Sequence, residues 1–286
     1  MSKVRKSQKP KSLSSGRPPV LQKAKASLSA KATRTLIRSH HSLHKALADA
    51  LKHGDERTAK SIKAQIEEKG GLKSYQQASI QGQSNERGGD TSKFLIEWLP
   101  KDFAKDAGKL RMLEVGALST DNVCSRSGLF DVTRIDLNSQ GSGILQQDFM
   151  ERPLPVSDND KFDIISLSLV LNYVPDAPGR GEMLRRTCKF LLSEPSSTLT
   201  EAQRDFFPSL FLVLPAPCIA NSRYMDEPLL AEILRSLGYV LVKRKLTSKL
   251  IYYLWRLETV VQKKHFHKRE VNPGKARNNF CILMES

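Results

Sequence analysis

The chain has 286 residues, a net charge of +16 and an apolar fraction of 39%, which fits one globular domain of about 200 residues plus a segment that stays unpacked. No apolar run is long enough to span a bilayer and no stretch has the features of a signal peptide, so we expect no membrane partner. The four cysteines lack the close spacing of a metal site, so we expect reduced thiols and no metal: Cys124, Cys188, Cys218 and Cys281.

The N-terminal segment, residues 1–32, is rich in Lys, Ser and Pro, and residues 1–48 hold twelve Lys or Arg and no Asp or Glu. A segment of this composition buries too little apolar surface to offset its ordering entropy, so we predict a disordered basic tail. Charge concentrated outside the core favours a polyanionic partner, and nucleic acid rather than membrane because no lipidation motif accompanies it. The alternative is a solvated tail that aids solubility.

Residues 33–105 are predicted to form a helical N-terminal extension. Apolar residues recur at three- and four-residue steps from about position 32, Gly54 breaks the run, and a second helix is expected over 56–69. A third helix is expected over 91–99, ending before Pro100. The first helix carries three histidines that could be metal ligands, although its basic composition favours nucleic-acid contact: His40, His41 and His44.

Residues 106–286 are predicted to form an α/β domain. Apolar strand patterns alternate with helix patterns, which predicts a parallel, doubly wound sheet. Two late strand patterns with no helix between them, 239–245 and 249–257, predict an antiparallel return at one edge. The remaining expected strands are 110–115, 132–137, 144–147, 162–171, 209–214 and a final one at 280–284, and the expected helices are 182–192 and 227–237.

Ligands of open α/β sheets bind at the carboxyl ends of the strands. The first expected strand ends at Glu114 and turns at Gly116, and we expect both residues to bind a cofactor. A side chain in place of Gly116 would collide with a cofactor lying over the turn. Asp136 ends the next strand, twenty residues further on, where a carboxylate can accept both hydroxyls of a ribose. The turn alone is equally compatible with an ordinary buried glycine, and Asp136 alone with a capping role.

Two further pairs follow later strands. Asp148 can accept from an adenine amine and Phe149 can pack on the ring, unless they are a surface Asp beside a core Phe. Asn172 and Tyr173 end a charge-free central strand pattern, at the place where a transferred group should sit. The alternative for Tyr173 is packing against the following helix.

The chain resembles the fungal 25S ribosomal RNA adenine-N1 methyltransferases. The resemblance lies in LEVGAL (113–118), RIDLN (134–138), QQDFM (146–150), FDIISLSLVLNYVPDAPGRGEML (162–184), YQQASIQGQ (75–83) and RNNFCIL (277–283). It implies a class I Rossmann-like methyltransferase sheet with an antiparallel late edge strand. It also implies that Gly116 and Asp136 bind S-adenosylmethionine, and it points to large-subunit ribosomal RNA or a pre-ribosome as substrate and the nucleolus as the location.

Methylation of adenine N1 needs no general base, because N1 has a free lone pair; the adenine must only be exposed and aligned. We expect Tyr173 to stack on the base and Asn172 to contact the adenine amine or the methionine end of the cofactor. Animal relatives of this family resemble cofactor sensors, so the alternative is an S-adenosylmethionine-sensing protein that acts through protein partners. The basic ends favour the RNA enzyme. Oligomeric state is unknown.

Overall fold

The computed structural model describes residues 30–71, 73, 74, 77, 89–100, 108–139, 141–195, 199–258 and 264–285. The expected disordered tail lies outside the described residues as far as position 29, and so does most of the stretch 75–83. Within the described ranges, no helix is long and apolar enough to cross a membrane.

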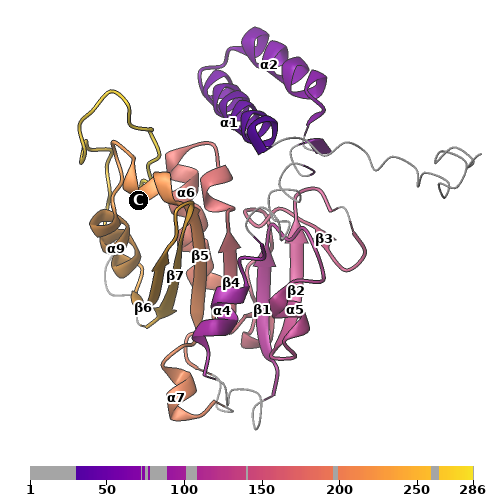
Figure 1. The fold of residues 1–286 in the computed structure, drawn as a ribbon, viewed down its shortest axis with the longest axis vertical. Helices are drawn as coiled ribbons and strands as arrows, with labels where there is room; N and C mark the ends of the chain where they lie inside the picture. The colour runs from indigo at the N-terminus through magenta and orange to yellow at the C-terminus, as the bar shows by residue number, and fades with distance from the viewer. Residues whose placement is uncertain are drawn as a thin grey trace, which may run out of the picture.

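A seven-stranded sheet forms the centre of the molecule, in the order β3-β2-β1-β4-β5-β7-β6 (Figure 1). Neighbouring strands pair in parallel except for β7, which runs antiparallel to both β5 and β6. The predicted class I arrangement is therefore confirmed, with the antiparallel β7 lying just inside the edge strand β6. The strands are β1 (Leu110–Val115), β2 (Phe130–Asp136), β3 (Leu145–Gln146), β4 (Ile164–Ser168), β5 (Ser209–Pro215), β6 (Tyr239–Leu246) and β7 (Leu250–Leu257).

Helices cover both faces of this sheet. Leu113 and Val115 of β1 lie in one buried cluster with side chains of α6 and α9, whereas Leu110 and Met112 lie in the other with Leu95 of α4. Alternate residues of β1 thus face opposite layers, which is typical of a parallel sheet buried on both sides. The helices of this part are α4 (Lys93–Trp98), α5 (Val123–Arg126), α6 (Ala177–Phe190), α7 (Glu201–Arg204), α8 (Ala216–Ala220), α9 (Glu227–Ser236), and the 3₁₀ helices η3 (Asp158–Asp160) and η4 (Leu171–Tyr173).

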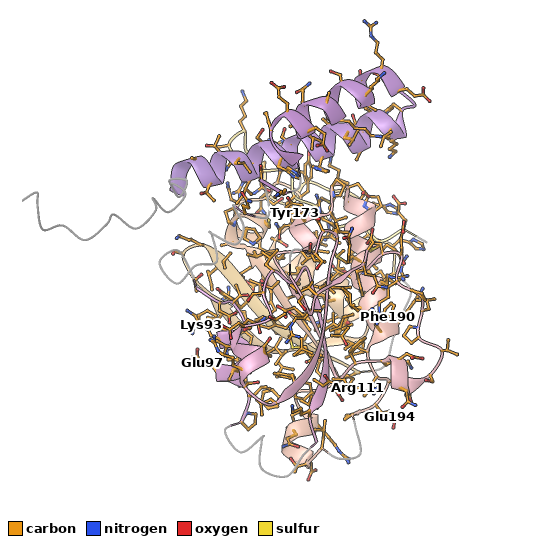
Figure 2. The ribbon with its side chains drawn as sticks, turned by 90° about the vertical axis from the view of Figure 1, so that its right-hand side faces the viewer. Lys93, Glu97, Arg111, Tyr173, Phe190 and Glu194 are labelled. Carbon is orange, nitrogen blue, oxygen red and sulfur yellow. The ribbon has the colours of Figure 1, made fainter. Side chains whose placement is uncertain are left out.

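A helical hairpin lies beyond the carboxyl ends of the parallel strands (Figures 1 and 2). It consists of α1 (Ala30–Lys52) and α2 (Glu56–Glu68), which confirms the two predicted helices and the break at Gly54. Asp55 caps α2 by accepting a hydrogen bond from the backbone N–H of Thr58 at 3.0 Å. The hairpin has a small core of its own: Ala50, Ala59, Ile62 and Ile66.

Two sequence predictions differ from the structure around α6. The helix begins at Ala177 rather than at residue 182, because Asp176 accepts from the backbone N–H of Gly179 at 2.7 Å and Pro178 occupies the first turn. The predicted strand at 280–284 is wrong. Its backbone joins no strand of the sheet: Met284 makes one isolated antiparallel bridge to Phe266, and the segment crosses α6, where the carbonyl of Cys281 accepts from the Arg180 side chain.

The third predicted helix is α4, and it packs against the sheet. Leu95 is fully buried in the cluster that contains Leu110 and Met112 of β1. α4 thus shares the core of the α/β domain, although it precedes residue 105, where the sequence places the end of the extension. That boundary stays a prediction.

Candidate active site at the carboxyl edge of the sheet

The structure brings most of the predicted site residues to one edge of the sheet. Gly116 follows β1, Asp136 ends β2, Asp148 follows β3 and Asn172 follows β4. These four strands are neighbours in the sheet, in the order β3-β2-β1-β4. Because parallel strands end at the same edge, the four positions share one side of the molecule, below the α1–α2 hairpin.

The turn at Gly116 requires glycine for two reasons. Its φ of +73° lies in the left-handed region that side chains disfavour. A Cβ at this position would also lie 2.6 Å from Cγ2 of Val170, a residue of the loop after β4. The backbone N–H of Gly116 donates to the carbonyl of Ile135 at 2.8 Å, which holds the turn against β2. The two loops after β1 and β4 therefore approach closely at a point where one residue has no side chain.

Asp136 is held at the end of β2 by its own backbone surroundings. Its Oδ1 accepts a hydrogen bond from the backbone N–H of Asn138 at 2.8 Å, and its carbonyl accepts from the N–H of Gln147 at 2.9 Å. These contacts orient the carboxylate and join β2 to β3. The predicted ribose contact is consistent with this position and stays a prediction.

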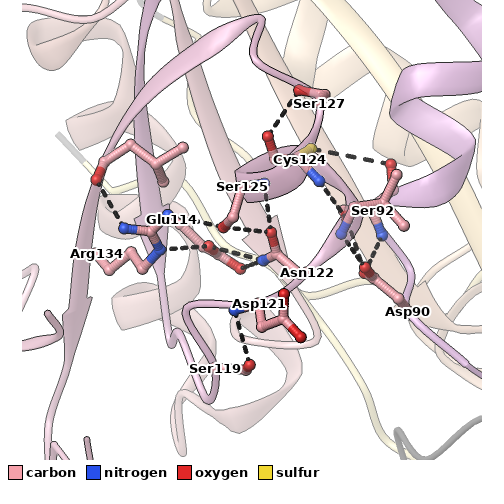
Figure 3. A network of polar contacts seen from close by, with 12 residues as sticks. Asp90, Ser92, Glu114, Ser119, Asp121, Asn122, Cys124, Ser125, Ser127 and Arg134 are labelled. Carbon is pink, nitrogen blue, oxygen red and sulfur yellow. Dashed lines mark hydrogen bonds and ion pairs between the residues drawn. The ribbon is translucent and has the colours of Figure 1, made fainter. Parts of the chain in front are cut away.

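Glu114 is the centre of a polar network beside the turn (Figure 3). Asn122 donates from Nδ2 to both carboxylate oxygens, at 2.8 and 3.0 Å, and Nε of Arg134 lies 4.0 Å from Oε2. Burial raises the pKa of Glu114 to about 7, against the opposing effects of Asn122 and Arg134. The carboxyl group thus titrates near neutral pH and has protein partners, and its predicted cofactor contact stays a prediction.

Asp90, which no sequence motif indicates as a site residue, forms the other half of this network. Asp90 accepts from the backbone N–H of Val123 through Oδ2, and from the N–H and hydroxyl of Ser92 through Oδ1 at 2.8 and 2.7 Å. Asp90 therefore ties the start of α4 to the start of α5. An acidic residue shortly before a helix pattern is a capping signal, but the partner in α5 is 33 positions away and leaves no trace in local sequence.

Asp148 and Phe149 have different surroundings. Asp148 accepts from the backbone N–H of Met150 at 2.7 Å and remains partly exposed. The Phe149 side chain is only 2% exposed, and its ring centroid lies 5.4 Å from that of Phe190 in α6. The ring packs as part of the core, which is the alternative that the sequence left open, and this geometry gives the predicted adenine contact no support.

The loop after β4 has an unusual backbone. Leu169 is the only non-glycine residue with a positive φ in the described part of the chain, at +61°. Its neighbour Ser168 contacts Thr91 through the two hydroxyl oxygens, at 2.8 Å. The predicted long strand therefore ends at Ser168, and a single 3₁₀ turn carries Asn172 and Tyr173. Strain of this kind persists where the surroundings hold it, and it is frequent at ligand sites.

Asn172 has a buried amide oxygen without a hydrogen-bond partner among the described residues. Leaving a buried carbonyl-type acceptor unpaired costs about 1–3 kcal/mol. Native proteins rarely keep such groups without a reason, and a ligand donor is one such reason. Asn172 is therefore the strongest candidate for contact with a base or a cofactor.

Tyr173 contacts the N-terminal hairpin. Its hydroxyl lies 3.1 Å from Nδ1 of His40 in α1, and the two rings stack with centroids 6.1 Å apart. Burial, together with the nearby His44, lowers the pKa of His40 to about 4. The His40 ring is therefore neutral at physiological pH. The Tyr173 side chain therefore contacts α1.

The described residues contain no group of three or more His, Cys, Asp or Glu that could hold a metal ion. His40 and His44 lie close together, with ring centroids 4.3 Å apart, but have no third such residue beside them within those ranges.

A family model matches residues 60–282, and its description is Bmt2, 25S rRNA (adenine(2142)-N(1))-methyltransferase. The chain belongs to the Bmt2 family. The match includes the whole sheet and the carboxyl-edge residues described above, and it confirms the resemblance seen in the sequence. It begins inside α2, so α1 and the residues before it lie outside the matched region.

Two curated relatives support membership of the Bmt2 family. The 25S rRNA (adenine(2142)-N(1))-methyltransferase of Saccharomyces cerevisiae is 45% identical over 226 residues, covering 78% of this chain and 63% of the yeast protein. The 25S rRNA adenine-N(1) methyltransferase of Schizosaccharomyces pombe is 39% identical over 267 residues, covering 87% of this chain and 91% of that protein. The 16S rRNA methylase RmtB has a TM-score of 0.42 and 12% identity, over 79% of this chain and 98% of RmtB.

Proposed function

We propose that this protein transfers a methyl group from S-adenosylmethionine to N1 of an adenine in large-subunit ribosomal RNA. Among its structural features, the observation that carries the proposal is the buried Asn172 Oδ1 at the carboxyl end of β4, which has no hydrogen-bond partner among the described residues. Adenine offers an amine donor beside N1, so a base placed against this acceptor would present N1 to the same site. Membership of the Bmt2 family supports the same substrate class.

The residues present fit the cofactor. A Cβ on Gly116 would collide with the Val170 side chain, so only glycine lets the turn after β1 approach the loop after β4, at the edge where ligands of such sheets bind. The oriented carboxylate of Asp136 ends the adjacent strand and can accept from ribose hydroxyls. S-adenosylmethionine supplies an electrophilic methyl group on a sulfonium centre. Gly116 and Asp136 would hold the adenosine part, as the resemblance implies.

The protein's own contribution to the chemistry is positioning. Adenine N1 attacks through its in-plane lone pair, so no side chain has to remove a proton before transfer. Asn172 would accept from the adenine amine and fix the base edge, while Tyr173 would stack on the base plane. Because N1 is engaged in pairing within a duplex, the adenine must be unpaired or flipped before it enters.

Two basic surfaces could hold the RNA around this edge. The hairpin exposes cations on α1 and α2, and the segment 264–277 exposes several more. In that segment, Lys268, Lys275 and Arg277 make no ion pair with any described residue, so they remain available to phosphate groups. The basic N-terminal residues would add to this footprint, and a nucleolar location would follow from a pre-ribosomal substrate.

The direct test is methyl transfer to large-subunit RNA that lacks the modification, as a transcript and within stripped large-subunit particles. We expect N1-methyladenosine by mass spectrometry after digestion, with product formation that requires S-adenosylmethionine. Asp136→Ala should lower the yield at limiting cofactor and recover part of it at saturation. If the protein binds S-adenosylhomocysteine but modifies neither substrate, the sensor alternative gains support and the proposed enzyme is rejected.

A further inference from the structure

Arg180 joins the loop after β4 to the C-terminal part of the chain. It lies in the first turns of α6, and its guanidinium donates from Nη1 to the carbonyl of Cys281 at 2.8 Å and from Nη2 to the carbonyl of Pro175 at 3.2 Å. The guanidinium carbon also lies 4.8 Å from the centre of the Phe280 ring. One side chain thus contacts both the end of the Asn172–Pro175 loop and a segment more than a hundred residues away in sequence.

The C-terminal segment is a firm anchor for this contact. The backbone N–H of Leu283 donates to the carbonyl of Ala177 at 3.1 Å. A Cβ on Gly181 would lie only 1.8 Å from the carbonyl oxygen of Leu283, so the segment crosses α6 in direct backbone contact. The side chains of Phe280 and Ile282 are buried in the main core cluster. A guanidinium bound to this segment therefore has a fixed position.

The loop on the other side of Arg180 needs such an anchor. It begins at Leu169, whose positive φ is costly for a residue with a side chain. The N–H of Leu169 donates to Val213 of β5 at 3.0 Å, which fixes the start of the loop. At the other end of the loop, Pro175 has no N–H to donate, and its carbonyl accepts from Arg180.

We infer that Arg180 is a positioning residue for methyl transfer: by holding the Pro175 carbonyl against the C-terminal segment, it keeps Asn172 and Tyr173 in place at the carboxyl edge. This role rests on the proposed function. This role accounts for the presence of a guanidinium at a site where burial lowers the pKa of Arg180. A planar guanidinium with several donors can reach both carbonyls at once, which a lysine ammonium at the same position cannot do with the same geometry.

Arg185 provides a matched control on the same helix. It also donates to the backbone of the C-terminal segment, at the carbonyl of Glu285, and it pairs with Glu182 at 2.8 Å. No contact joins Arg185 to the loop at 172–175 within the described structure. Replacing either arginine removes a contact between α6 and the C-terminal segment, but only the Arg180 variants release the Pro175 carbonyl.

The experiment compares Arg180→Lys, Arg180→Met and Arg185→Met with the unmodified protein in RNA methylation, binding of S-adenosylhomocysteine, RNA binding and thermal denaturation. For Arg180→Met we expect kcat to fall roughly ten- to a hundredfold, because small misplacements of reacting groups have effects of that size. Its affinities for S-adenosylhomocysteine and RNA should change by no more than about threefold, since Arg180 touches neither ligand in this assignment. The kcat of Arg180→Lys should lie between those of Arg180→Met and the unmodified protein. This variant provides the test if Arg180→Met does not fold.

Arg185→Met should keep kcat within about twofold, whatever its melting temperature. The inference is overturned if Arg180→Met and Arg185→Met lower kcat equally. It is also overturned if Arg180→Lys folds and keeps full kcat. A fall in affinity that matches the fall in kcat would also overturn it, because this points to general loosening of the site. If the unmodified protein methylates no RNA, the proposed function is itself rejected, and the role of Arg180 with it. This outcome differs from the others because the unmodified protein, and not only a variant, is inactive.

Discussion

His40 and Tyr173 are 133 positions apart in the chain and are joined by a contact of 3.1 Å between Nδ1 and the tyrosine hydroxyl. The contact attaches α1 to the loop after β4, so the hairpin lies directly above the candidate methyl-transfer position (Figure 2). A base that stacks on the Tyr173 ring must either occupy the face that His40 leaves open or displace His40 from the ring. The pair therefore links the hairpin to the entry of substrate.

Replacing Tyr173 distinguishes stacking from anchoring. If its ring stacks on the adenine, Tyr173→Ala should lower the single-turnover rate by about 1–3 kcal/mol, roughly ten- to a hundredfold. Tyr173→Phe should keep most activity, because the ring remains. His40→Ala is the matched control: it removes the same contact from the other side and should leave the rate within about threefold. Equal losses in His40→Ala and Tyr173→Ala would mean that Tyr173 only anchors α1.

The turn at Gly116 gives a second prediction, with Gly128 as its control. Both glycines have positive φ, +73° and +75°, so an alanine at either position should cost roughly 1 kcal/mol in unfolding free energy. Only at Gly116 would the new Cβ meet another group, Val170 at 2.6 Å. Calorimetric titration should therefore find weaker binding of S-adenosylhomocysteine by Gly116→Ala and unchanged binding by Gly128→Ala. Equal affinities would remove Gly116 from the cofactor site.

The raised pKa of Glu114 predicts that replacing this residue with Gln stabilises the protein at high pH and much less at low pH. Its pKa is raised to about 7 in the folded protein from an ordinary value of 4.5, so the folded state binds more protons between these values. Its contribution to stability is therefore complete below pH 4.5 and is lost as the pH rises through 7. Glu114→Gln does not titrate and keeps an acceptor for Asn122. We expect it to raise the melting temperature at pH 8 by a few degrees, corresponding to about 1–3 kcal/mol, and far less at pH 5.

The comparison that checks this prediction is the difference in melting temperature between Glu114→Gln and wild type across pH 4.5 to 8. A difference that does not change with pH would mean that the carboxyl group does not titrate in this range. Asp136→Asn, a carboxylate change at the same edge of the sheet, serves as a reference.

The basic C-terminal surface should contribute to RNA affinity through phosphate contacts. Replacing Lys268, Lys275 and Arg277 with Gln should weaken RNA binding and reduce the slope of log affinity against log salt by about 2 to 3, because each phosphate contact contributes roughly 0.7 to 0.9 units. Lysines near the amino ends of the strands form the control set, replaced in the same way: Lys109, Lys161 and Lys189. If the two triple variants have the same salt slope, the C-terminal cations are not part of the RNA surface.

The sequence predicts the architecture well where the signal is local. Charge-free runs such as 209–214 are buried strands, and the twenty-residue spacing between Gly116 and Asp136 places both at the carboxyl edge. Helix α6 begins earlier than predicted because Pro178 is acceptable in a first turn, although proline usually indicates the end of a helix. Capping by Asp176 is the local signal that could have corrected this boundary.

The features that the sequence does not predict depend on contacts between distant parts of the chain. Phe280 and Ile282 alternate like a strand, yet their segment joins no strand of the sheet, crosses α6 and buries both side chains in the main core cluster. The partners of Tyr173 and Arg180 lie 133 and 101 positions away, respectively. Periodicity and spacing report which residues are apolar and where strands end, but not which surfaces meet, so such contacts appear only in three dimensions.

The segment around Leu283, which crosses α6, is translated after every strand of the sheet, so its contacts with α6 form late during synthesis. Every strand of the sheet leaves the ribosome before residues 278–284 do, and domains generally form while the rest of the chain is still being made. A nascent chain that ends at residue 270 would therefore contain the full sheet but no Cys281 carbonyl for Arg180. The contact through which Arg180 holds the end of the Asn172–Pro175 loop therefore forms only after residue 281 has been translated, later than every strand of the sheet.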